Sequence, residues 1–93
     1  MSIRVTHVRL APGGHAHEHI TDLKWVGYEG GQTGQNSKAE LVSWIDNEDG
    51  KAFVESQTTK VSVGVVKPEG AAPYLRTYAN GVWTDNLLSL PRF

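Results

Sequence analysis

The chain lacks cysteine, long apolar runs and any large excess of charge of one sign. Without cysteine it has no disulfides, thiolate metal ligands or thiol nucleophiles, and this composition suits a reducing compartment. No apolar stretch approaches the roughly 18 residues that a membrane span requires, and the opening residues MSIRVTHVRL lack the apolar core of a signal peptide. We therefore expect a cytoplasmic protein that does not engage a membrane.

The charges are nearly balanced, with a formal net charge of −1. Lys and Arg are scattered singly along the sequence, so no basic run is present to hold phosphates, and nucleic acid is disfavoured as a partner. Familiar enzyme motifs are also missing, among them the serine nucleophile elbow, the phosphate-binding loop and the helical HExxH zinc motif. These absences favour a non-catalytic protein with no cofactor, although they do not exclude an enzyme.

The length of 93 residues is enough for one modest hydrophobic core, so we expect a single globular domain over residues 1–93. About six short segments alternate apolar and polar residues, which is typical of strands. The turns between them are too short for parallel crossovers. The sequence therefore predicts an α+β fold with a mostly antiparallel sheet of about six strands and one helix packed on it.

The helix is predicted from about Lys38 to Glu48. Ser37 stands three residues before Glu40, which is the spacing of a capping box. Apolar residues then follow at helical spacing, and they place Trp44 on the buried face and in the core. The residues of this apolar stripe are Leu41, Trp44 and Ile45.

Two local signals concern the strands. The apolar alternation of the first strand slips near His7, which predicts a β-bulge. The dipeptide Asn80-Gly81 favours a tight type I′ hairpin between strands at Tyr74 to Tyr78 and Val82 to Asn86. Cross-strand pairing in this hairpin would bring Arg76 near Asp85.

The stretch GGHAHEHI contains three of the four histidines, His15, His17 and His19, with Glu18 between the last two. One hypothesis is a metal site built on the three histidines, and another is a pH-sensing role. Their spacing is not a diagnostic zinc pattern, so we assign no metal. We favour a structural role in which His17 and His19 hydrogen-bond to backbone groups or to the C-terminal hairpin, with Asp85 or Asn86 as partners.

The last block is dense in aromatic and charged residues. Trp, Tyr and Arg are enriched at binding hot spots, although the same residues are also ordinary in a strand pair with a surface ion pair. The candidate binding residues of the chain are His17, Glu18, His19, Arg76, Tyr78, Trp83, Asp85 and Asn86.

The HEHI segment and the C-terminal block together resemble segments of a known family. An opening strand IRVTHVRL, the motif HEHI at His17 to Ile20 and the closing block at Pro73 to Phe93 are similar to those of small bacterial and phage proteins classed as a domain of unknown function. The resemblance spans nearly the whole chain and implies a single domain. It implies no activity, substrate or catalytic residue.

The favoured hypothesis is a non-catalytic binding module that engages an unknown protein through its sheet and C-terminal hairpin. A phage or mobile-element inhibitor or accessory protein would fit the size. The alternatives are a metal-dependent protein that uses His15, His17 and His19, and a nucleic-acid-binding module. The two exposed edges of an open sheet also suggest a symmetric homodimer.

Overall fold

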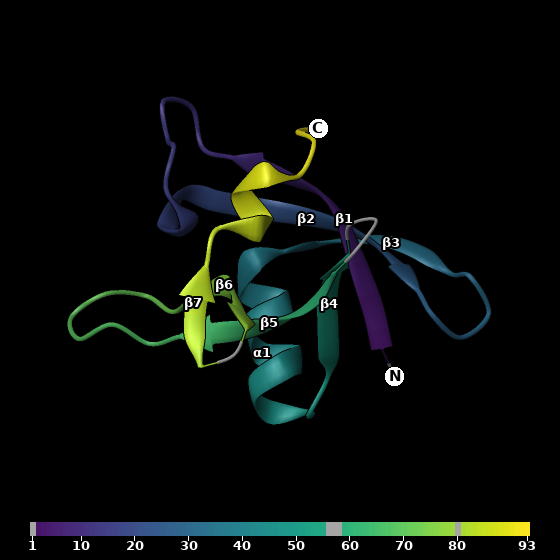
Figure 1. Cartoon of the computed structure of the whole chain (residues 1–93). Coiled ribbons are helices and arrows are strands. Elements are labelled where there is room, and N and C mark those ends of the chain that lie inside the picture. The colour runs from purple at the N-terminus through teal and green to yellow at the C-terminus, as the bar shows by residue number, and fades with distance from the viewer. Residues whose placement is uncertain (1, 56–58, 80) are drawn as a thin grey trace.

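The computed structural model describes residues 2–55, 59–79 and 81–93, which form a seven-stranded sheet with one α-helix (Figure 1). The strands are β1 (Ser2–Leu10), β2 (Ile20–Gly27), β3 (Thr33–Ser37), β4 (Lys51–Glu55), β5 (Lys60–Val66), β6 (Tyr74–Ala79) and β7 (Val82–Thr84). The helices are the α-helix α1 (Lys38–Asn47) and the short 3-10 helices η1 (His17–His19) and η2 (Asn86–Ser89). The α+β class is confirmed. In the described ranges, no helix is long and apolar enough to cross a bilayer.

The strands lie in the order β3-β2-β1-β4-β5-β6-β7. The sheet therefore has seven strands where the sequence predicted about six. The strand least evident from the sequence is β3, whose residues TGQNS are polar or small and show no apolar alternation. Every pair is antiparallel except β1 with β4, because α1 lies between β3 and β4 and lets the chain cross over.

The predicted capping box at the start of α1 is confirmed. The Ser37 hydroxyl accepts from the Glu40 backbone N–H at 3.2 Å, and the Glu40 carboxylate accepts from the Ser37 N–H at 2.9 Å. Two of the free N–H groups at the helix start are thereby satisfied. These hydrogen bonds hold the pKa of Glu40 below its usual value.

Helix α1 covers one face of the sheet. Ile3 and Trp25 from the sheet and Leu41 and Trp44 from α1 line one cavity of about 180 Å³ between the two layers. Leu41 is buried, whereas Trp44 is only half-buried against the core in which the sequence placed it. The Trp44 ring lies instead against Gly50, where a Cβ atom would fall 2.3 Å from the ring.

The predicted bulge in β1 is confirmed between Val5 and His7, where the register with β2 shifts. An extra residue at this point reverses the alternation of side chains along the strand. Ile3, Val5 and Val8 can therefore all face the core, and Val8 is 0% exposed.

The C-terminal segment closes the core over the second half of β1 (Figure 1). The Val8 N–H donates to the Pro91 carbonyl at 3.0 Å, and the Phe93 N–H donates to the Val8 carbonyl at 3.3 Å. Leu87, in η2 just before this segment, is 0% exposed. Residues from both ends of the chain therefore pack into one core. The fully buried Leu75 of β6 belongs to the same core.

We expect Leu75→Ala to lower the free energy of unfolding by about 2–5 kcal/mol, because it removes a fully buried side chain and leaves a cavity. Val82→Ala is the matched control, since Val82 is 61% exposed, and it should change stability by less than about 0.5 kcal/mol. Urea denaturation measures both. Equal midpoints for the two variants would contradict this assignment of the core.

Candidate functional site

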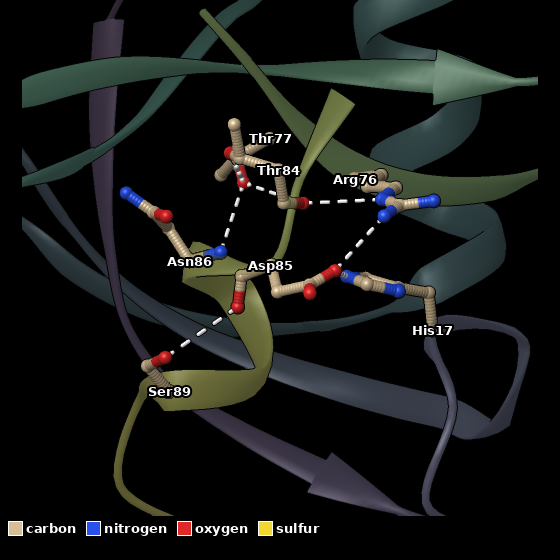
Figure 2. Close-up of polar contacts among 7 residues, drawn as sticks. All are labelled: His17, Arg76, Thr77, Thr84, Asp85, Asn86 and Ser89. Carbon is tan, nitrogen blue, oxygen red and sulfur yellow. Dashed lines mark hydrogen bonds and ion pairs between the residues drawn. The ribbon is translucent and has the colours of Figure 1, made fainter. Parts of the chain in front are cut away.

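The HEHI segment and the C-terminal block meet at β6, with His17 at their contact (Figure 2). His17 is 6% exposed, and its ring stacks on Tyr74 with 6.5 Å between ring centroids. Its Nε2 atom lies 3.9 Å from Oδ1 of Asp85, which is too long for a hydrogen bond. The predicted hydrogen bond between His17 and Asp85 is therefore not formed, although the two side chains are neighbours.

Asp85 is held in place mainly by Arg76 (Figure 2). The Arg76 guanidinium donates from Nη2 to Asp85 Oδ1 at 2.9 Å and from Nε to the Thr84 carbonyl at 3.1 Å. The expected proximity of Arg76 and Asp85 is therefore confirmed. Because the Asp85 side chain is 72% exposed, we treat this ion pair as positioning rather than strongly stabilising.

A buried hydroxyl fixes the chain on the other side of Asp85. The Thr77 side chain is 0% exposed, and its Oγ1 accepts from the Asn86 N–H at 3.1 Å and lies 2.6 Å from Thr84 Oγ1. Asn86 thus contributes through its backbone to the start of η2. The predicted strand from Val82 to Asn86 is too long, because β7 ends at Thr84 and η2 begins at Asn86.

The ring nitrogen Nε2 of His17 is buried and has no hydrogen-bond partner among the described residues. Burial lowers the pKa of His17 below its ordinary value of 6.5, and the nearby Arg76 charge lowers it further. The carboxylates of Asp85 and Glu18 act in the opposite direction but do not reverse the shift. His17 is therefore neutral at pH 7.

His19 has the structural role that the sequence predicted. Its Nδ1 accepts from the backbone N–H groups of His15 at 3.3 Å and Ala16 at 3.2 Å, which closes the turn before η1. The side chain packs so closely on Gly14 that a Cβ atom there would lie 2.4 Å from His19 Cβ. The Glu18 carbonyl accepts from Lys38 Nζ at 2.9 Å, which ties η1 to the start of α1.

A metal site at these histidines gains no support from the geometry. Within residues 2–55, 59–79 and 81–93, no group of three or more His, Asp or Glu side chains is arranged to hold a metal ion. His15 is exposed, His17 is buried, and one nitrogen of His19 already accepts backbone hydrogen bonds. The structure does not bring the three imidazoles together.

The remaining predicted residues, Tyr78 and Trp83, lie farther along the hairpin. They are cross-strand partners whose rings meet edge to face with centroids 5.0 Å apart. Tyr78 is 43% exposed and Trp83 is 39% exposed. Asn80 of the predicted turn lies outside the described residues, but Gly81 has a φ of 81°, as a tight turn of this type requires.

Sequence reasoning missed a second aromatic group near this pair. Tyr28 and Phe53 meet with ring centroids 6.0 Å apart, and Lys60 Nζ lies 4.4 Å from both centroids. The Tyr28 hydroxyl donates to Glu55 at 2.8 Å, and burial together with that carboxylate raises the pKa of Tyr28 to about 12. No local motif signals this cluster, because Tyr28, Phe53 and Lys60 lie apart in the sequence.

A family model described as "Protein of unknown function (DUF3892)" matches residues 4–91. The chain belongs to this family. The match includes both HEHI and nearly all of the C-terminal block, which agrees with the resemblance stated from the sequence. No curated protein and no solved structure gives a significant match.

We expect stability to fall as the pH drops below about 6.5. A His17 pKa that is lower in the folded state means that the unfolded chain binds its proton first, so protonation favours unfolding between the unfolded-state pKa and the lowered folded-state pKa. The full contribution is present above the unfolded-state pKa. Urea denaturation at about pH 7.5 and pH 5.5 should show a smaller loss for His17→Gln than for wild type. His15→Gln, at an exposed site, should lose as much as wild type; equal losses for all three proteins would contradict this role.

We also expect the melting temperature of untagged protein to be unchanged by a chelator or by added zinc. The physical reason is that a metal that binds only the folded state stabilises it, and these histidines offer no converged ligand set. Differential scanning calorimetry with and without EDTA makes the comparison. A melt that EDTA lowers, or that zinc raises, would favour the three-histidine metal hypothesis.

Proposed function

We propose that this protein is a non-catalytic binding module that engages a macromolecular partner through the β6–β7 hairpin and the adjoining sheet face. The observation that carries the proposal is the exposed cross-strand pair Tyr78 and Trp83, which lies at the β7 edge of the sheet. Large apolar side chains grouped in this way mark interaction sites more often than singly scattered ones.

The burial of Trp83 supports this interpretation. Its ring lies over Gly64, where a Cβ atom would be only 3.1 Å away, so the strand below leaves room for the indole. One side of the ring is thereby packed, while 39% of the residue stays accessible. A ring held rigidly but left half-open loses little conformational entropy when a partner covers it.

The cluster at His17 supports the same interpretation in a different way. Arg76, Asp85 and Thr77 fix β7 and the start of η2 relative to β6. We infer that this network positions the hairpin instead of performing chemistry. Of the binding residues predicted from the sequence, Tyr78 and Trp83 then form the proposed binding surface. His17, His19 and Asn86 support it.

Three sequence-based hypotheses, on the partner, the oligomeric state and the cellular location, remain part of the proposal. A protein partner, including an inhibitory or accessory role in a phage or mobile element, stays the sequence-based hypothesis about the partner. Homodimer formation would use the sheet edges β3 and β7, of which β7 spans only three residues. A cytoplasmic location is proposed from the absence of cysteine.

The test is site-specific photo-crosslinking in cells that express the protein. A photo-reactive amino acid at position 83 should give discrete crosslinked species with a partner macromolecule, because that position lies on the proposed surface. The matched control is the same residue at Ala39, which is exposed on α1. Absence of crosslinks at position 83, or the same species from both positions, would contradict the proposed function.

A further inference from the structure

We propose that the sheet face opposite α1 binds single-stranded nucleic acid, with a base stacked at Tyr78 and Trp83 and a phosphate at Lys60. This inference rests on the proposed binding function and names the partner class of the same surface. It depends on the cross-strand register, a hollow at the ends of β5 and β6 and the placement of the charges.

The register places two aromatic groups on one row across the sheet. The row runs over β4, β5, β6 and β7 and consists of Phe53, Ser62, Tyr78 and Trp83. Because strands lie about 4.8 Å apart, roughly 10 Å separates the Cα atoms of Phe53 and Tyr78. A shallow hollow of about 430 Å³ lies at the ends of β5 and β6, where its lining includes Lys60, Ser62 and Tyr78 but neither Phe53 nor Trp83.

The basic side chains of the strands all lie on this same face. The pairing of β1, β2, β4, β5 and β6 gives six basic residues the same orientation as Phe53 and Tyr78: Arg4, Arg9, Lys24, Lys51, Lys60 and Arg76. Two acidic strand residues, Asp22 and Glu55, share the face, and Asp49 and Asp85 from outside the strands form ion pairs with Lys51 and Arg76. The face is therefore positive, although the whole chain carries a net charge of −1.

Acidic residues gather on the other side of the molecule. Helix α1 contains Glu40 and Asp46, and Glu48 and Asp49 follow directly after it. Lys38 is the one basic residue of the helix, and Lys67 and Lys51 pair with Asp46 and Asp49. Because α1 packs on the opposite face of the sheet, the two sides of the protein differ in sign. This asymmetry gives electrostatic complementarity to a polyanion on one side only.

Three of the six basic residues on the face opposite α1 form no ion pair with a described carboxylate, although Asp22 lies across from Arg9 and Glu55 lies across from Lys60. Among the described residues, Arg9, Lys24 and Lys60 take part in no ion pair, and each lies over an aromatic ring instead. Lys60 Nζ is 4.4 Å from the Tyr28 and Phe53 centroids. Cation–π contacts hold a charge in place without cancelling it, so the ammonium group remains available to a phosphate.

This combination matches the chemistry of a single strand better than that of a duplex or an apolar protein. Single-strand binding uses cationic grooves for the backbone and exposed rings on which bases stack. In a duplex the base faces are already stacked on one another, and an apolar partner would leave Lys60 unpaired. Neither proposed contact involves the sugar, so DNA and RNA should bind alike.

Fluorescence anisotropy with labelled oligothymidylate and oligouridylate of about 15 nucleotides tests the proposal. Wild type should bind both with affinity that falls as salt rises, and more tightly than a duplex of the same length. Trp83→Leu should weaken binding by about 5-fold to 100-fold, the range for loss of one stacked base. Lys60→Gln should reduce the slope of log affinity against log salt by about 0.7, the value for one phosphate contact on a single strand.

The matched control for Lys60→Gln is Lys67→Gln, which removes the same charge from a residue paired with Asp46 of α1 at 2.8 Å. It should bind within about twofold of wild type. No binding below about 100 µM protein, equal effects of Lys60→Gln and Lys67→Gln, or tighter binding to duplex would each overturn the proposal. If the crosslinks at position 83 then contain protein, the binding function stands and only the nucleic-acid partner is wrong.

Discussion

The structure depends on one constraint, which is that a single helix covers only one face of a seven-stranded sheet. Side chains alternate between the two faces along each strand, so the central strands supply apolar residues to the covered face, whereas the edge strand β3 supplies Gly34 and Asn36. Charged side chains cannot follow them there without partners, because desolvation of a charge is too costly. The six basic residues of the strands therefore all lie on the open face. The arrangement that builds the core thus also concentrates positive charge on the surface proposed for binding.

The ends of the chain are joined by the same core. The segment from η2 to Phe93 pairs with Val8 of β1, and Leu87 fills the space beneath it. The η1 segment packs on β6, so His17 reaches Asp85 and Arg76. In this chain the contact holds HEHI and the C-terminal block together, so that each positions the other. Tyr78 and Trp83 lie on β6 and β7, the strands that this contact holds in place.

The balanced composition of the chain does not reveal how charge is distributed over its surface. The net charge of −1 and the scattered basic residues gave no indication of a nucleic-acid partner. Folding separates the charges, with carboxylates along and just after α1 and basic residues on the open face. Cation–π contacts keep Lys60, Lys24 and Arg9 on that face without ion pairs among the described residues. Electrostatic recognition depends on this local field, and the total charge says little about it.

The sequence by itself determined the features that depend on near neighbours. The capping box at Ser37, the bulge before His7 and the pairing of Arg76 with Asp85 all follow from short-range spacing, and all three are present. Tertiary structure alone decided which distant strands pair. It made β3 from a polar segment, set β4 parallel to β1, left Trp44 half-buried, and placed Phe53, Tyr78 and Trp83 on one row. The physical reason is that side-chain alternation fixes a face within one strand, whereas the register between strands is fixed only when the whole core packs.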